Sequence, residues 1–192
     1  MLKILVAFKS EAIPLIAHFG LSRNDCVDRY PLYASEYVKL IICGIGSKNA
    51  LRATTILSEY GRDSDRWLNF GVAGSGGYVI GDFVVGGRVL DFITGDQWSL
   101  ASCEDADLQV GEICCVNEVQ KTYRGDTVYD MESAGFLRGL DVIGATQKGI
   151  CLKLISDGPT NADILTLKSI KQLMHNRTSE LTQILYKLFP AS

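Results

Sequence analysis

Val-Tyr-Asp-Met-Glu-Ser-Ala-Gly-Phe at residues 128–136 and Leu-Lys-Leu-Ile-Ser-Asp at residues 152–157 are the two stretches that decide the fold. In each, an apolar run rich in strand-forming residues delivers a carboxylate, Glu132 in the first and Asp157 in the second. Such runs are typical of the buried strands of an α/β sheet, which present functional side chains at their carboxyl ends. The pattern therefore places two carboxylates at one edge of one sheet.

Both carboxylates also have ordinary structural explanations. Glu132 suits the cap of a helix over residues 132–140. Asp157 suits the opening of a turn with Gly158 and Pro159, because these residue types favour turns. On the pattern alone, this structural interpretation is the more economical one.

The order of motifs along the chain resembles the purine nucleoside phosphorylase and nucleosidase superfamily. The resemblance rests on Asp-Met-Glu-Ser-Ala at 130–134, followed by an apolar strand that ends in Ser-Asp at 156–157. Three further segments match in the family's order: a first strand leading to Glu11, Gly-Ile-Gly at 44–46 before a helix, and Asn-Phe-Gly-Val-Ala-Gly-Ser at 69–75. Within the superfamily, the chain is most similar to the methylthioadenosine/adenosylhomocysteine nucleosidases and the futalosine hydrolases.

The resemblance implies that three carboxylates cleave the N-glycosidic bond of a purine nucleoside. Glu132 would accept hydrogen bonds from ribose hydroxyls, with Met131 packed against the sugar. Asp157 would give a proton or a strong hydrogen bond to purine N7, and Glu11 would orient and deprotonate the attacking water. The reaction builds positive charge on the ribose and negative charge on the departing base. Asp157 must then stay protonated near neutral pH, which burial beside other carboxylates favours.

The resemblance also assigns backbone and small residues to the ligand. Gly46 would border the water or phosphate position, since glycine at a strand-to-helix turn lets backbone N–H groups approach an oxygen-rich ligand. Ala73, Gly74 and Ser156 would line the ribose and base pocket. Each glycine also suits a bare turn, and Glu11 also suits the first turn of a helix, where a carboxylate complements the helix dipole.

The periodicity predicts one α/β domain over residues 1–192, with a mixed central sheet flanked by helices. A helix is expected from Ser10 onward, with Pro14 in its first turn, and another over 47–60. One final amphipathic helix is expected to carry the apolar stripe of the C-terminal region. Strands are expected at 3–8, 32–37, 38–43, 67–72, 81–90, 111–116 and in the two stretches quoted above.

Residues 91–127 depart from the family pattern. The family has a longer segment here, with a further helix and a loop whose aromatic residue contacts the base. Val119, Tyr123 and Trp98 are candidate substitutes, although each is more readily explained as a core or surface residue. The departure falls on the part of the site that would hold the base and the 5′ group.

Composition excludes several classes of function. The 19 basic and 22 acidic residues give a net charge of −3 without a basic cluster, which disfavours nucleic-acid binding. No apolar run is long enough to span a membrane, and a start that leads directly into a strand indicates a cytoplasmic protein. The six cysteines form no Cys-x-x-Cys pair, so we expect reduced thiols, no metal site and no cofactor.

Two alternatives to a hydrolase stay open. A phosphorylase would need basic phosphate ligands, and Lys48 and Arg52 lie near the right turn without matching a motif. A nucleoside-binding relative without turnover would keep the pocket alone. For either, as for the hydrolase, the partner is a small nucleoside, and the resemblance implies a homo-oligomer, most simply a dimer.

Overall fold

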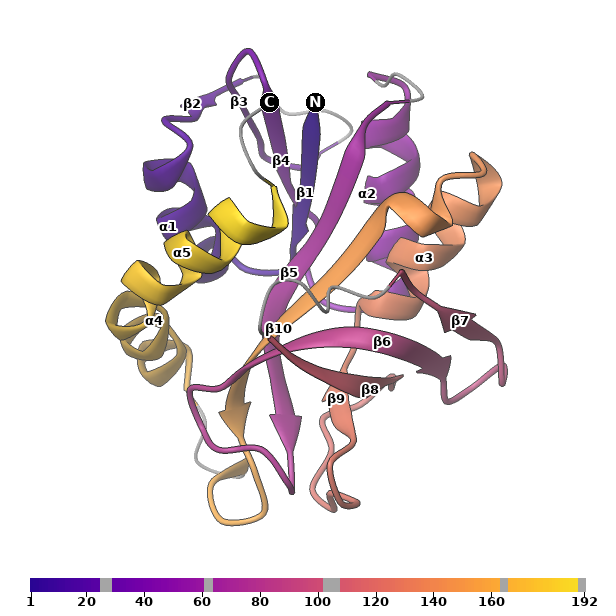
Figure 1. The fold of residues 1–192 in the computed structure, drawn as a ribbon, viewed down its shortest axis with the longest axis vertical. Coiled ribbons are helices and arrows are strands. Elements are labelled where there is room, and N and C mark those ends of the chain that lie inside the picture. The colour runs from indigo at the N-terminus through magenta and orange to yellow at the C-terminus, as the bar shows by residue number, and fades with distance from the viewer. Residues whose placement is uncertain (25–28, 61–63, 102–107, 163–165, 190–192) are drawn as a thin grey trace.

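The computed structural model describes residues 1–24, 29–60, 64–101, 108–162 and 166–189, which form a central mixed sheet flanked by helices (Figure 1). Its strands are β1 (Leu2–Val6), β2 (Ser22–Arg23), β3 (Leu32–Ala34), β4 (Val38–Ile42), β5 (Arg66–Ser75), β6 (Phe83–Asp91), β7 (Gln97–Ser99), β8 (Gln109–Cys115), β9 (Val128–Asp130) and β10 (Gly149–Asp157). Its helices are α1 (Lys9–His18), α2 (Ser47–Ser58), α3 (Ser133–Val142), the 3₁₀ helix η2 (Thr146–Lys148), α4 (Leu167–Asn176) and α5 (Thr178–Leu188). The predicted α/β class with a mixed sheet is confirmed.

The sheet closes on itself at one end. β5 pairs with β10 in parallel, β10 with β6 in antiparallel, β6 with β8 and β8 with β9 in parallel, and β9 returns to β5 in antiparallel. These five strands therefore form a ring. From β5 the sheet continues outward through β1, β4, β3 and β2. The two carboxylate-bearing stretches of the sequence contribute β9 and β10, which both border β5.

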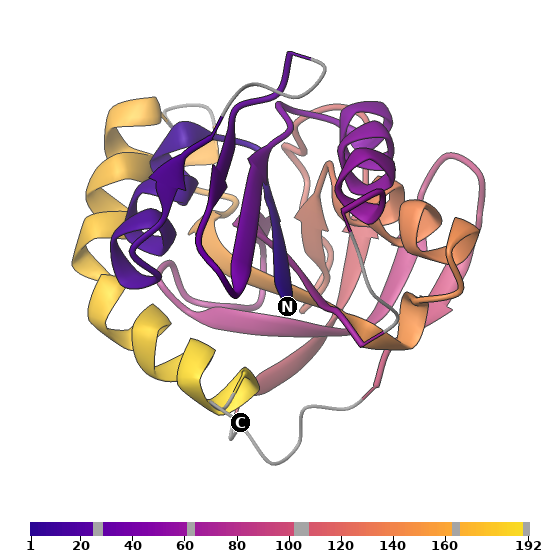
Figure 2. The same cartoon turned by 90° about the horizontal axis from the view of Figure 1, so that it is seen from above.

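Helices cover the two faces of the sheet, and each face has its own apolar core. α2 and α3 pack together on one face, and α1, α4 and α5 lie on the other (Figure 2). Apolar side chains alternate between the two faces along β1, where Leu5 joins the first core while Ile4 and Val6 join the second. This period of two is the reason that the run forms a strand buried on both sides. None of the described helices is both long and apolar enough to cross a membrane.

Two glycines of α3, one at its start and one further along it, bring this helix against α2. A Cβ atom on Gly135 would lie 1.9 Å from the carbonyl oxygen of Ser47, and one on Gly139 would lie 2.6 Å from Cβ of Thr54. The two helix backbones can approach this closely because neither glycine carries a side chain. The contact places Glu132, the N-cap residue of α3, beside Gly46, the N-cap residue of α2.

Three predicted elements differ in the structure. The C-terminal helix is two helices, because the chain bends at Arg177, which pairs with Glu180 in the first turn of α5. α1 begins at Lys9, so Pro14 lies in its interior and not in its first turn. No strand was expected between residues 90 and 111, yet this stretch contains β7, which pairs with the second half of β6.

Candidate active site

Glu132 lies at the junction of the two helix starts. Its Oε1 atom accepts a hydrogen bond of 2.7 Å from the backbone N–H of Gly46, and its side chain makes no capping hydrogen bond to α3. The structural explanation of Glu132 as a helix cap is therefore incomplete. Burial, and then the charge of Asp130, raises the pKa of Glu132 to about 7, although Lys153 and the Gly46 N–H act in the opposite direction.

Asp157 ends β10, where the pairing with β5 shifts register between Ile155 and Asp157. Its Oδ1 atom accepts a hydrogen bond of 2.5 Å from Oγ of Ser156, and its Oδ2 atom accepts one from the hydroxyl of Tyr123. The backbone N–H of Gly158 in the following turn is bound by Asn161 instead. Asp157 is thus not the residue that caps this turn, and its carboxylate faces the cavity described below.

Glu11 occupies the junction between β1 and α1, as predicted, and is only 1% exposed. Its carboxylate accepts hydrogen bonds from the backbone N–H groups of Ala7 (2.9 Å), Phe8 (2.8 Å) and Val72 (2.9 Å). Burial raises its pKa, and these backbone contacts oppose that effect. Glu11 is not among the residues that line the cavity, so its assignment as the base that activates water stays a prediction.

Lys153 also belongs to this site, although its position in an apolar strand gave no sign of a role in the sequence. It is 1% exposed, and its ammonium group lies 2.6 Å from Oδ2 of Asp130 and 2.7 Å from Oδ1 of Asn69. Asp130 also accepts hydrogen bonds from the hydroxyl and the backbone N–H of Ser133. Burial alone would lower the pKa of Lys153, but the charge of Asp130 in particular raises it overall, so the lysine stays charged.

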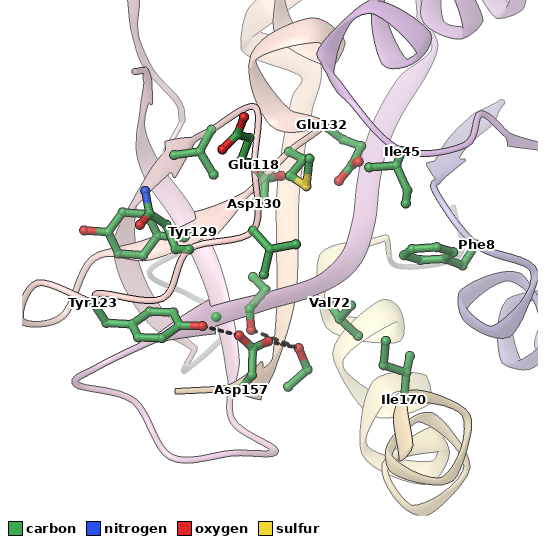
Figure 3. Close-up of a pocket in the computed structure, with 17 residues that line it drawn as sticks. Phe8, Ile45, Val72, Glu118, Tyr123, Tyr129, Asp130, Glu132, Asp157 and Ile170 are labelled. Carbon is green, nitrogen blue, oxygen red and sulfur yellow. Dashed lines mark hydrogen bonds between the residues drawn. The ribbon is translucent and has the colours of Figure 1, made fainter. Parts of the chain in front are cut away.

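A cavity of about 150 Å³ is bordered by Asp130, Glu132 and Asp157, but not by Glu11 or Lys153. Figure 3 shows Glu132 and Asp157 apart from each other along its wall, with apolar side chains between them. Its lining consists of Phe8, Ile45, Val72, Ala73, Gly74, Val116, Glu118, Val119, Gln120, Tyr123, Tyr129, Asp130, Met131, Glu132, Ser156, Asp157 and Ile170.

The structure brings most of the predicted site residues to this cavity. Asp157, Glu132, Met131, Ser156, Ala73 and Gly74 line it. Gly46 does not line it but orients Glu132 through its backbone N–H.

The segment of residues 117–127, which joins β8 to β9, supplies two of the three side chains that the sequence offers as candidates for the base-contacting position. Tyr123 and Val119 both line the cavity, where Val119 is 65% exposed. Trp98 is not a lining residue; its indole N–H binds Asp141 at 2.6 Å. The signal for Tyr123 was its position eight residues after a strand and shortly before the Asp-Met-Glu stretch, which is too weak to single out one aromatic residue.

Nothing in the described part of the chain resembles a metal centre. No group of three or more histidine, cysteine, aspartate or glutamate side chains there is arranged to hold an ion. Four cysteines that the structure describes, Cys43, Cys114, Cys115 and Cys151, are buried and unbridged, as expected of small apolar residues. Cys26 and Cys103 lie outside the described residues.

Comparison with known proteins identifies the fold through structure. No protein-family model and no curated protein sequence matches the chain. The structure matches the 5'-methylthioadenosine/S-adenosylhomocysteine nucleosidase of Neisseria meningitidis in complex with methylthio-immucillin-A, with a TM-score of 0.80, 16% identity and 97% of each chain covered. The chain has the nucleosidase fold.

Two other solved structures with this fold match the chain to a similar degree. The Campylobacter jejuni 5'-methylthioadenosine/S-adenosylhomocysteine nucleosidase matches with a TM-score of 0.78, 16% identity and 97% of each chain covered. A mutant of the Helicobacter pylori futalosine hydrolase matches with a TM-score of 0.76 and 16% identity, covering 96% of this chain and 97% of that one. The family resemblance of the sequence is thus matched by the fold over nearly the whole chain.

Proposed function

We propose that this protein hydrolyses the N-glycosidic bond of a purine nucleoside or nucleoside-like compound and releases the base. The observation that carries this proposal is the placement of Asp157 and Glu132 on one apolar-lined cavity in a chain with the nucleosidase fold. The matched proteins that carry nucleosidase names, one of them in complex with methylthio-immucillin-A, support the substrate class.

The two carboxylates suit the two charges that develop in the reaction. Glu132 is an acceptor for ribose hydroxyls as the sugar becomes positive, and Met131 beside it offers an apolar contact to the sugar. Asp157, at the other end of the lining, is the group that contacts the departing base. Interactions that strengthen as these charges develop accelerate the reaction, whereas contacts made equally to the bound nucleoside do not.

Hydrolysis is favoured over phosphorolysis by the charge of the cavity. Among the described residues that line it, none is lysine or arginine, and the polar side chains include Glu118, Asp130, Glu132 and Asp157. A phosphate ion would meet these carboxylates without a cation in the lining to offset them. Lys48 and Arg52 are exposed on α2 and are not lining residues.

Glu11 is assigned as the group that activates water. In support, it lies at the β1–α1 junction near Lys153 and Glu132 and is held in place by three backbone N–H groups. Two of the three residues that bind its carboxylate, Phe8 and Val72, line the cavity. Glu11 would therefore have to reach a water molecule in the cavity past these two residues.

The assembly is proposed to be a homodimer of a cytoplasmic enzyme. Apolar side chains at the cavity support the dimer, because Val119 is 65% exposed and Ile45 is 49% exposed. Apolar surface that borders a site is commonly covered by a partner. A light-scattering mass of 21.0 kDa at micromolar concentration would contradict this assembly.

Chromatographic detection of free base tests the function. A panel of purine nucleosides is incubated with the protein, with and without phosphate, and both the base and the sugar product are identified. Base release that is independent of phosphate and yields free sugar is the expected result. Ribose 1-phosphate would identify a phosphorylase, and nucleoside binding without any product would identify a binding protein.

A further inference from the structure

Both oxygen atoms of Asp157 are occupied by hydroxyl groups of the protein. Ser156 donates to Oδ1 from the neighbouring position in β10, whereas Tyr123 donates to Oδ2 from the 117–127 segment (Figure 3). Ser156 is attached to the same strand and moves with it. Tyr123 reaches across the cavity from a separate segment of the chain, so its hydrogen bond is the contact that a change in that segment would break.

The ring of Tyr123 lies on the backbone assigned to the base. A Cβ atom on Gly74 would lie 2.5 Å from Cε1 of Tyr123 and 2.6 Å from Oδ2 of Asp157. A Cβ atom on Gly76 would lie 3.0 Å from Cβ of Tyr123. The ring also meets Tyr129 edge-to-face, with centroids 5.8 Å apart. An aromatic ring that carries one hydrogen-bond donor therefore already occupies the surface between Gly74 and Asp157.

The size of the cavity agrees with this occupation. Its volume is about 150 Å³. Pockets that enclose small organic ligands span roughly 300–1,000 Å³. The space beside Asp157 is thus too small for a whole nucleoside while the ring of Tyr123 remains in it.

We propose that Tyr123 stands in for the base in the unliganded protein and leaves Asp157 when a ligand enters. This inference rests on the proposed function. A planar heterocycle that carries an N–H group is the ligand class that replaces both the ring contact of the phenol and its hydrogen bond to Oδ2. Because the ligand and the phenol ring need the same space between Gly74 and Oδ2 of Asp157, each molecule that binds must first break the Tyr123–Asp157 hydrogen bond.

Adenine binding, measured by calorimetry, tests the competition. The Tyr123→Phe variant keeps the ring but cannot bind Asp157, so adenine should bind it about tenfold more tightly than the parent, the effect of one hydrogen bond. Tyr123→Leu, which removes the hydroxyl and the ring, should bind adenine more tightly as well. Tyr37→Phe is the matched control, because Tyr37 is 69% exposed and is not a lining residue, and its affinity should equal that of the parent.

The outcomes separate this inference from the proposed function. If the parent binds adenine and both Tyr123 variants bind it equally or more weakly, Tyr123 assists binding and the inference is overturned. If neither the parent nor any variant binds adenine, the inference is overturned, whereas the proposed function is decided separately by base release from the nucleoside panel. Binding by the Tyr123 variants alone would support the inference strongly, since the phenol would then exclude the ligand.

Discussion

The two carboxylates of the cavity are held in different ways. Glu132 is bound by a backbone N–H at the start of α2, and the contact of α2 with α3 through Gly135 and Gly139 fixes that geometry. Asp157 is bound by two side-chain hydroxyls, which rotate about single bonds. The sugar end of the proposed site is therefore built from packed helices, and the base end from groups that a ligand can displace.

The largest effect is expected from the base end. Asp157→Asn keeps the size of the side chain but cannot supply an acidic proton, so base release should fall at least about a hundredfold. The melting temperature should change little, because asparagine still accepts and donates hydrogen bonds. Base release is measured by chromatography beside thermal melts, with Asp96→Asn on the surface as the control. A variant that retains more than about a tenth of the parent rate would remove Asp157 from the mechanism.

Substitution of Lys153 tests whether its ion pair with Asp130 stabilises the sugar end of the proposed site. Lys153→Met leaves Asp130 buried without its cation and should lower the free energy of unfolding by about 3–5 kcal/mol. Adding Asp130→Asn to the same chain removes the unpaired charge and should restore part of the loss. Denaturant unfolding of the single and double variants measures this. Equal free energies of unfolding for Lys153→Met and the parent would show that the Lys153–Asp130 pair does not stabilise the folded protein.

The pH dependence of stability examines Glu132 itself. Its pKa is about 7 in the folded protein against an ordinary value of 4.5, so the folded state binds the proton more tightly than the unfolded state does. The contribution of Glu132 to stability is then complete below about pH 4.5 and is lost as the pH rises through 7, by roughly 3 kcal/mol in total.

Glu132→Gln isolates that contribution from those of other groups. Glutamine does not titrate, so the variant should gain stability relative to the parent as the pH rises from 5 to 8. Thermal melts of both proteins across this range provide the measurement. A constant difference between the two proteins would show that Glu132 titrates in its ordinary range. In assays of base release, the parent rate should rise with pH through about 7, since only the ionised carboxylate accepts two ribose hydroxyls.

The helix contact behind Glu132 gives the smallest of these effects. Gly135→Ala introduces a methyl group against the backbone of Ser47 and should cost about 1–3 kcal/mol, despite the higher helix propensity of alanine. Gly139→Ala is the matched variant and should cost less, because its added methyl group would lie 2.6 Å from Cβ of Thr54, whereas that of Gly135→Ala would lie 1.9 Å from a backbone carbonyl oxygen. Denaturant unfolding ranks the two. A larger loss for Gly139→Ala would place the tightest helix contact away from Glu132.

Much of this arrangement was predictable because it depends on local pattern. Apolar runs that end in Glu132 and Asp157 indicated two buried strands and a shared edge, and the structure places both side chains on one cavity. Lys153 was not predictable in its role, since its partner Asp130 lies on another strand and only the fold brings them together. The break between α4 and α5 was missed because the apolar stripe continues across it, while the polar residues at 176–180 end one helix and begin the next.

The closure of the five-stranded ring could likewise not be predicted from the sequence. β9 has three residues and pairs with both β8 and β5, and nothing in so short a segment specifies two partners. Tyr123 belongs to the same category, because its partner Asp157 is 34 residues away and its position depends on the path of the 117–127 segment. Non-local pairing of this kind is set by the whole fold and not by local propensity.

The ring also limits how copies of this chain can associate. Strands inside it are paired on both sides, and in the described part of the chain the terminal strands of the sheet are β2, with two residues, and β7, with three. A strand of another molecule added to either would find backbone groups for only a few hydrogen bonds. Strand addition, the usual route from exposed sheets to fibrils, is thereby restricted, and specific assembly of this protein must use side-chain surfaces.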